Sequence, residues 1–267
     1  MTGASEPGGV RRHDADHVAT LTLDRPAARN ALSSGLLAAL AEHLHAIHRD
    51  PSVHVVVLAA AGPAWCAGHD LRELAALPDP EARLALFQRC SDLMVSITTL
   101  RQPVIAQVHA TAPAAGCQLV ATCDLAVAGE SARFATPGVG IGLFCTTPMV
   151  ALSRAVAPKH AMELLLTGDA VDAHEAARIG LVNRVVPDHE LAAATAELAA
   201  RIAGRSPSAV AAGKAAAAHE RGLSLVDAYA HASRAMADDL VRPDAIEGID
   251  AFLTKRHPRW TTPGGDL

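Results

Sequence analysis

Apolar residues fall into two patterns along the chain, short continuous runs and runs with helical spacing. The continuous runs lie at 53–59 and 104–109, as expected of strands covered on both faces. Before both runs, after Ser33 or Ser34, one helix face is predicted by apolar residues near the 3.6-residue period: Leu36, Leu37, Leu40, Leu44 and Ile47. The alternation of such strands and helices predicts an α/β fold with much parallel pairing.

Weaker patterns complete the expected organisation. Strands are expected at 19–23, 125–128 and 181–186, and helices at about 80–100 and 115–122. Asp70 is placed to cap a short helix. From Pro158 onward the pattern is nearly all helical, with Gly168 and Gly180 placed as the glycines that end helices. We expect a core at residues 1–200 and a helical C-terminal region at 201–267, with no linker between them.

Composition narrows the function classes. A chain of 267 residues buries roughly three quarters of its surface, so its core needs no disulfide or structural metal. Net charge −5 and 3% aromatic residues argue against a nucleic-acid partner. The five cysteines form no C-x-x-C pair, which indicates free thiols in a reducing compartment. With no secretory h-region and no apolar stretch long enough for a membrane span, we expect a soluble cytoplasmic protein.

Common cofactor and metal motifs are missing. The glycines at 138, 140 and 142 lack the six-residue dinucleotide fingerprint. His43, His45 and His48 share one predicted helix, but only an i,i+3 pair could face one metal ion and no further ligand is identifiable. We therefore interpret these histidines as a solvated helix face and expect no metal site.

Three segments together resemble the crotonase, or enoyl-CoA hydratase/isomerase, family. They are LDRPAARNAL at 23–32, WCAGHDL at 65–71 and AAGCQL at 114–119. Later landmarks of the same family are LTG at 166–168, residues 173–181 and FLTKR at 252–256. The resemblance runs in order from about residue 18 to about residue 260, and residues 68–70, 114–118 and 134–138 are similar to one branch of the family.

The resemblance implies a fold, an assembly and a substrate class. The fold is an α/β, crotonase-like spiral of ββα units with a helical C-terminal region. The assembly is a homotrimer or a dimer of trimers, in which the C-terminal region takes part and completes the coenzyme A pocket. The substrates are acyl-CoA thioesters, whose oxygen is held by the backbone N–H groups of His69 and Ala115. No cofactor is expected, because coenzyme A enters as part of the substrate.

The chemistry of such a site explains the local sequence. An enolate-like intermediate places negative charge on the thioester oxygen, and two prepositioned N–H donors, an oxyanion hole, stabilise it. Ala115 lies where a helix begins, so its free N–H and the positive end of the helix dipole face the oxygen. The small residues at 112–116 could instead only pack a helix against a sheet. Because the family-like segment at 66–71 accompanies them, we favour the oxyanion hole over simple packing.

Both catalytic glutamates of the family's hydratases are replaced. Gln118 stands at the first position and Gly138 at the second. Glutamine holds water by hydrogen bonds but cannot shuttle a proton, and general acid–base catalysis contributes about 10²–10⁴ per group. Ordinary hydration is therefore doubtful. Two alternatives are a non-catalytic acyl-CoA-binding or regulatory protein and a different reaction of acyl-CoA.

Other side chains are weaker candidates for chemistry. Cys145 could be a nucleophile if its pKa were lowered, although a buried small hydrophobe is the commoner role of such a residue. His69 could act as a base, but we favour a partly exposed loop histidine. His109 is a weak candidate at a strand end. Asp124 is expected to bond to the backbone, and Asp70 to cap a helix rather than act as an acid.

Coenzyme A carries phosphates, so cations are expected at one end of the pocket. Arg25, Arg29, Arg72 and Lys255 have family-like positions for this, and plain surface charge is the alternative. The full set of expected substrate-binding residues is Arg29, Ala67, Gly68, Asp70, Leu71, Arg72, Gly116, Phe144, Cys145, Phe252 and Lys255.

Overall fold

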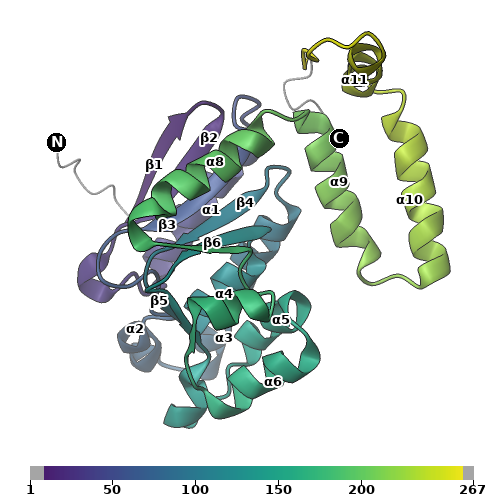
Figure 1. Ribbon diagram of the computed structural model, residues 1–267. Helices are drawn as coiled ribbons and strands as arrows, with labels where there is room; N and C mark the ends of the chain where they lie inside the picture. The colour runs from purple at the N-terminus through teal and green to yellow at the C-terminus, as the bar shows by residue number, and fades with distance from the viewer. Residues whose placement is uncertain (1–8, 261–267) are drawn as a thin grey trace.

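A six-stranded sheet forms the centre of the computed structural model, which describes residues 9–260 (Figure 1). Its strand order is β1-β2-β3-β4-β6-β9. Only β1 and β2 pair antiparallel, and the other neighbours are parallel, as predicted. The strands are β1 (Val10–Ala15), β2 (Val18–Leu23), β3 (Val55–Ala60), β4 (Val104–Val108), β6 (Leu125–Gly129) and β9 (Arg184–Val186). Part of the segment on which we predict no secretory signal lies outside the described residues.

A second, three-stranded sheet was not predicted. It comprises β5 (Thr111–Pro113), β7 (Arg133–Ala135) and β8 (Val171–Asp172), in the order β5-β7-β8. Strands this short carry too few side chains to show a period of two. Because β5 and β7 pair in parallel, with Pro113 opposite Ala135, the segments that follow them leave the sheet side by side. The small sheet thereby brings residues after 113 next to residues after 135.

Helices cover both faces of the main sheet, which explains its continuous apolar strands. In β3, Val56 and Leu58 belong to the larger apolar cluster, together with residues of α1 (Ser34–His48) and α3 (Pro80–Thr99). Val55 and Val57 belong to a second cluster with Leu198 of α8 (Leu191–Ala203). Alternate residues of a strand point to opposite faces, so every residue of such a run is buried.

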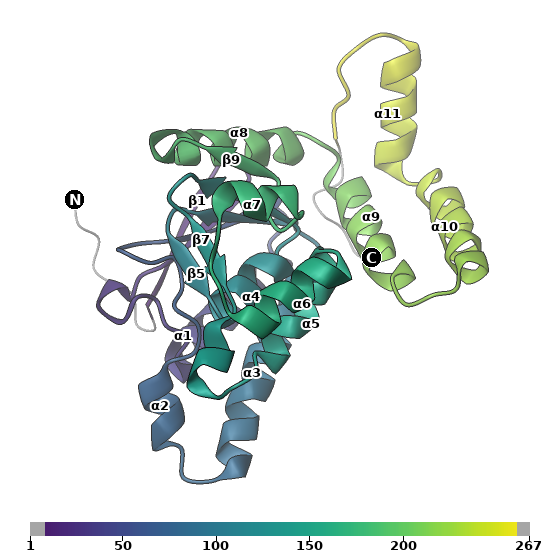
Figure 2. The same cartoon turned by 60° about the horizontal axis from the view of Figure 1, so that its bottom comes forward.

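Shorter helices connect the strands, and α4, α5 and α6 lie together among them (Figure 2). The shorter helices are η1 (Pro26–Ala28), α2 (Leu71–Ala76), α4 (Ala115–Thr122), η2 (Pro137–Ile141), α5 (Thr146–Ala155), α6 (Pro158–Thr167), α7 (Ala173–Arg178) and η3 (Asp188–Glu190). Helix α5 packs between α4 and α6. Gly168 and Gly180 follow helix ends with φ of 72° and 87°, which confirms their predicted role.

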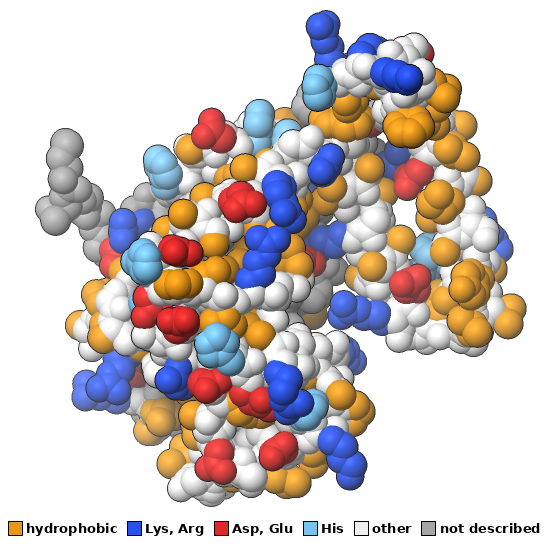
Figure 3. Space-filling view, viewed as in Figure 1, with side chains coloured by type: hydrophobic (Ala, Val, Ile, Leu, Met, Phe, Trp, Pro, Cys, Tyr) orange, Lys and Arg blue, Asp and Glu red, His pale blue; other side chains and the backbone are white. Residues whose placement is uncertain are grey.

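Three helices at the C-terminal end form an arm that projects from the core (Figures 1 and 2). The arm comprises α9 (Pro207–Glu220), α10 (Leu225–Asp239) and α11 (Pro243–Leu253). Its attachment includes Lys214, whose ammonium donates to Asp124 Oδ2 at 2.6 Å and to two backbone carbonyls at 3.0 Å. Helix α10 has no buried residue, and apolar side chains gather over the arm (Figure 3). No helix within residues 9–260 is long and apolar enough to cross a membrane.

Candidate functional site

The loop at 65–70 runs beside the chain that leads into α1. Leu32 N donates to Gly68 O at 2.7 Å, and Asp70 N donates to Leu32 O at 3.3 Å, which forms a parallel bridge between Leu32 and His69. In a parallel bridge the two neighbours of the central residue make these bonds, so the N–H of His69 points away from Leu32. The backbone thus presents this amide on the opposite side of the loop.

Two glycines allow the 65–70 loop to approach the start of α4. Gly68 has φ of 87°, and a Cβ there would lie 3.0 Å from Ala114 Cβ and 3.2 Å from Ala115 N. A Cβ on Gly116 would overlap the carbonyl of Cys66. The amides of His69 and Ala115 belong to these two closely packed segments, so side chains at 68 and 116 would hold them apart.

Helix α4 begins on a strained residue. Ala114 has φ 51° and ψ −119°, a conformation that non-glycine residues rarely adopt, and its N–H donates to Ala135 O at 2.8 Å. Such a backbone costs about 1–3 kcal/mol and persists where its surroundings enforce it. This backbone conformation turns the chain from β5 into α4, and the N–H of Ala115 is left without an intrahelical acceptor. Among the described residues, neither this N–H nor that of His69 has a protein acceptor.

Most of the buried polar atoms without hydrogen-bond partners belong to the two segments that carry these amides. In the part of the chain that the structure describes, such side-chain atoms are Trp65 Nε1, both ring nitrogens of His69, Gln118 Oε1 and Gln102 Oε1. All but the last belong to the 65–70 loop or to α4. Ala115 and Gln118 are three residues apart and share one face of that helix. An unpaired buried polar group costs about 1–3 kcal/mol, so this cluster is suited to a polar ligand.

The imidazole of His69 lies against the edge of Phe87, with ring centroids 5.2 Å apart and planes at 86°. Burial lowers the pKa of His69, while the nearby Leu32 backbone and Glu73 partly offset the shift. The ring is therefore neutral at neutral pH. The residue as a whole is partly exposed, as expected from the sequence, but both ring nitrogens are shielded from solvent.

At position 138, where the sequence analysis expects the family's second glutamate, the chain itself leaves no room for a side chain. Gly138 lies in η2, and Leu143 N donates to its carbonyl at 2.9 Å, which folds the following loop back over it. A Cβ on Gly138 would overlap the carbonyl oxygen of Leu143 and lie 2.9 Å from Cys145 Sγ. Burial raises the pKa of the Cys145 thiol, and the backbone of Gly138 offsets this only in part. The thiol is thus neutral and does not meet the condition set for an activated nucleophile.

Several predicted residues have structural roles. Asp70 caps α2 by accepting from Arg72 N and Glu73 N, as expected. The Arg25 guanidinium donates to Ala31 O at 2.8 Å and lies 3.5 Å from Asp70, so internal contacts hold it away from a free phosphate-binding role. His109 is hydrogen-bonded to the carbonyl of Gly62. Asp124 accepts from Val104 N, as expected, and also from Lys214, a residue that the sequence did not single out.

A buried asparagine that the sequence analysis missed fixes the turn before the site. Asn30 accepts from Arg25 N at 2.8 Å and donates to the carbonyls of Ala61 and Ala64 at 2.7 and 2.9 Å. It thereby ties the turn at 25–30 to the segment just before the 65–70 loop. A signal was present, because asparagine tolerates the left-handed conformation found here, with φ of 54°.

The remaining predicted binding residues divide between two places. Arg29, Leu71 and Arg72 are exposed beside the 65–70 loop, where the carbonyl of Arg29 accepts from Ala67 N at 3.0 Å. Phe144 is partly exposed and precedes Cys145 at the start of α5. Phe252 and Lys255 lie on or after α11, at the far end of the arm (Figure 2). Within one chain the structure does not bring these two residues to the site.

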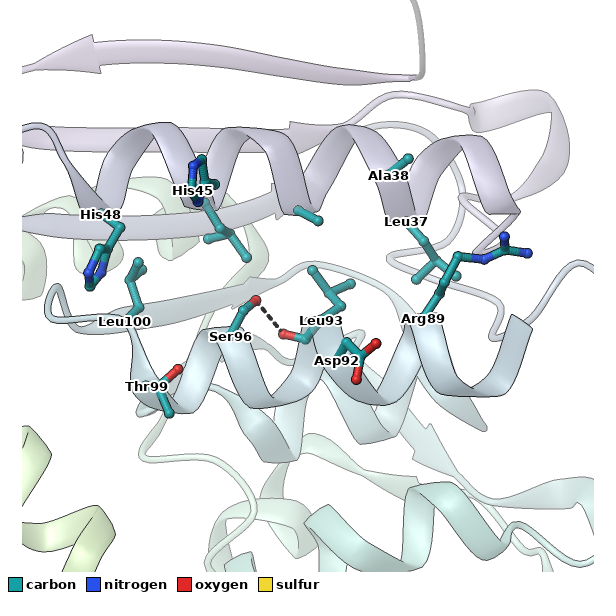
Figure 4. Close-up of a pocket in the computed structure, with 12 residues that line it drawn as sticks. Leu37, Ala38, His45, His48, Arg89, Asp92, Leu93, Ser96, Thr99 and Leu100 are labelled. Carbon is teal, nitrogen blue, oxygen red and sulfur yellow. Dashed lines mark hydrogen bonds between the residues drawn. The ribbon is translucent and has the colours of Figure 1, made fainter. Parts of the chain in front are cut away.

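A groove of about 540 Å³ lies between α1 and α3, away from this site (Figure 4). Half of the residues that line it are leucines and alanines, and His45, His48 and Arg89 lie along it. None of the predicted catalytic or binding residues lines this groove.

Comparison with known proteins places the chain in a family. The enoyl-CoA hydratase/isomerase family model matches residues 13–263. A mouse protein named enoyl-CoA hydratase domain-containing protein 3, mitochondrial, is 43% identical, over 96% of this chain and 86% of its own length. Its mitochondrial name does not match the cytoplasmic location expected from the sequence.

Solved structures agree in fold. An enoyl-CoA hydratase from Mycobacterium smegmatis has a TM-score of 0.92 and 49% identity, covering 95% of this chain and 99% of its own. The human enoyl-CoA hydratase domain-containing protein 3 has a TM-score of 0.92 and 42% identity, covering 94% of this chain and 100% of its own. These likenesses confirm the crotonase-like fold expected from the sequence. The chain belongs to the enoyl-CoA hydratase/isomerase family.

Proposed function

We propose that the protein binds acyl-CoA thioesters and holds the thioester oxygen between the N–H groups of His69 and Ala115. The observation that carries this proposal is the pair of amides without protein acceptors, on two segments packed together through Gly68 and Gly116. Unpaired polar atoms of Trp65, His69 and Gln118 support it. Family membership supports the choice of an acyl-CoA thioester as the ligand.

The expected chemistry is stabilisation of an enolate. Negative charge that develops on the thioester oxygen meets two fixed donors and the N-terminal end of α4. One such donor is typically worth about 10²–10³ in rate. Reactions of the hydratase/isomerase class pass through this intermediate, and Gln118 Oε1 is free to hold a water molecule by accepting one of its hydrogens.

A second candidate function is acyl-CoA binding without turnover. The observation that favours it is the loop at 138–145, which fills the space of the second carboxylate with Leu143 O and Cys145 Sγ. A protein that keeps the oxyanion hole and lacks both carboxylates would bind a thioester and release it unchanged.

Two further features fit the proposal. Arg29 and Arg72 are exposed beside the 65–70 loop, where cations would meet the phosphates of coenzyme A. The arm exposes apolar side chains, including Leu225, Val226 and Phe252, at 74%, 78% and 83%. We propose that a homotrimer or dimer of trimers covers them and brings Phe252 and Lys255 to the pocket of another copy. The five free thiols fit a reducing compartment.

The test is calorimetry and turnover with a panel of acyl-CoA and enoyl-CoA esters. We expect saturable binding that weakens when the thioester is replaced by free coenzyme A. Failure of every thioester to bind would overturn the proposal. Binding without turnover would favour the second candidate.

A restored carboxylate separates the two candidates further. Gln118→Glu replaces the buried amide by the acid of the family's hydratases and is expected to raise crotonyl-CoA hydration. Gln118→Leu, of similar size and unable to hold water, is the matched control and is expected to lower it. Gly138→Glu is unsuited to this test, because its side chain would overlap Leu143 O and open the loop.

A further inference from the structure

Leu143 O and the sulfur of Cys145 occupy the space in which a side chain at position 138 would begin. The sulfur lies 2.9 Å from the position that a Cβ of residue 138 would take, and Cys145 is 8% exposed. Cys145 precedes α5, and α5 packs against α4, whose first amide belongs to the proposed oxyanion hole. The thiol is therefore the group with an exchangeable proton that the chain supplies where the second glutamate is missing.

An independent observation indicates that a polar ligand belongs beside helix α4, against which α5 packs. Gln118 is 4% exposed, and its Oε1 has no hydrogen-bond partner. It lies on the face of α4 that also carries Ala115, and its neighbour Cys117 is close enough to Cys145 to interact electrostatically. An orphaned acceptor and a thiol thus flank the start of the same helix.

We propose that the thiol of Cys145 is the acid that donates a proton to the α-carbon of a bound enoyl-CoA thioester. The inference rests on the proposed function, because it requires the thioester oxygen to lie between the amides of His69 and Ala115. Gln118 Oε1 then holds the water that adds to the β-carbon.

The step balances without any further reactant. Water oxygen bonds to the β-carbon, the electron pair of the carbon–carbon double bond moves to the α-carbon through the enolate, and the S–H proton bonds to that carbon. The proton released from the water returns to the sulfur, so the thiol is regenerated. The backbone of Gly138, which interacts with the sulfur, stabilises the transient thiolate. One acid–base group and one water suffice for the net addition.

A buried thiol is better suited to donate a proton than to act as a nucleophile. Desolvation raises the pKa of Cys145, so the neutral form that can donate a proton predominates at neutral pH. Cys66, Cys90 and Cys117 are buried as well, but none of them is among the nearest neighbours of Gly138.

The experiment measures crotonyl-CoA hydration and deuterium incorporation at the α-carbon in D₂O, for the full-length protein and its variants. Cys145→Ala is expected to lower both rates at least 100-fold and to change the affinity for butyryl-CoA, measured by calorimetry, less than 3-fold. Cys90→Ala removes a buried thiol of α3 that is 1% exposed, and is expected to keep both rates. Circular dichroism and unfolding by urea check that both variants fold.

The dependence of the hydration rate on pH distinguishes an acid from a residue with only a structural role. If the thiol is the acid, the wild-type rate falls at alkaline pH as the thiol ionises. Cys145→Ser, whose hydroxyl does not ionise in that range, is expected to lose this alkaline limb together with most of the rate.

The outcomes separate this inference from the proposed function. A Cys145→Ala variant that binds butyryl-CoA and keeps its rate within 2-fold overturns the role of the thiol. Wild-type protein that binds thioesters but transfers no deuterium overturns it too, while leaving the proposed binding intact. A wild-type protein that binds no thioester overturns both.

Discussion

A substitution at Gly68 perturbs the proposed oxyanion hole directly and leaves the side chains around it unchanged. The residue has φ of 87°, and a Cβ there would lie 3.0 Å from Ala114 Cβ and 3.2 Å from Ala115 N. Gly68→Ala therefore has two separable effects. An alanine in the left-handed region costs about 1–2 kcal/mol. The two close contacts also press the 65–70 loop away from α4 by a few tenths of an ångström.

Gly180→Ala is the matched control. Gly180 also has φ of 87°, but the nearest atom to its Cβ position is Ala155 O at 3.8 Å, an ordinary contact. Both variants should lose about 1–2 kcal/mol of unfolding free energy in urea, because both carry the same backbone strain. Only Gly68→Ala also moves the amides of His69 and Ala115 apart.

The expected functional difference follows from that movement. Misplacement by about 1 Å costs on the order of 10²-fold in rate, so a smaller shift of the loop predicts about a 10-fold loss of turnover. Calorimetry with butyryl-CoA and the hydration rate of crotonyl-CoA are measured for wild type and both variants. Equal affinity and equal rate in Gly68→Ala and Gly180→Ala would refute the assignment of the hole to these two segments.

Three further predictions concern stability. Ala114→Gly relieves the strained N-cap of α4 and should raise the free energy of unfolding in urea by about 1 kcal/mol. A lower free energy of unfolding would contradict the strain. Lys214→Met removes the ammonium that donates to Asp124 and to two carbonyls, and leaves Asp124 only the N–H of Val104. It should cost about 2 kcal/mol in the same assay, less than the loss of a fully buried pair, because Asp124 is 29% exposed. Lys159→Met, at an exposed position, should cost almost nothing. Burial lowers the pKa of His48, His54 and His69, so below about pH 6.5 the unfolded chain binds more protons than the folded one and the unfolding free energy should fall as the pH drops. His69→Gln should reduce that fall, and a flat profile between pH 7 and 5.5 would argue against the lowered pKa values of these histidines.

Strong patterns in the sequence predicted most of the main sheet. The runs at 53–59 and 104–109 become β3 and β4, because both faces of these strands are covered and every position must be apolar. Strand β1 was missed, since four of its six residues, Arg11–Asp14, are polar or charged and lie at the edge of the sheet. The short strands β5, β7 and β8 were missed because their pairing depends on contacts between distant segments.

The sequence by itself determined the family, and it predicted the residues of the proposed site. The segments at 23–32, 65–71 and 114–119 pointed to the amides of His69 and Ala115 and to the replacement of both glutamates by Gln118 and Gly138. Local patterns also predicted Asp70 as a cap and Gly168 and Gly180 as helix ends, because capping depends on a residue's own side chain and backbone freedom.

Only the tertiary structure decided what fills the space between these residues. The fold-back of Leu143 and Cys145 over Gly138, the orphaned oxygen of Gln118 and the Lys214–Asp124 contact join positions far apart in the chain or depend on an exact approach of backbones. The projection of α9, α10 and α11 as an arm is likewise set by long-range contacts. Helical periodicity shows which face of a helix is apolar, but packing decides which surface covers that face.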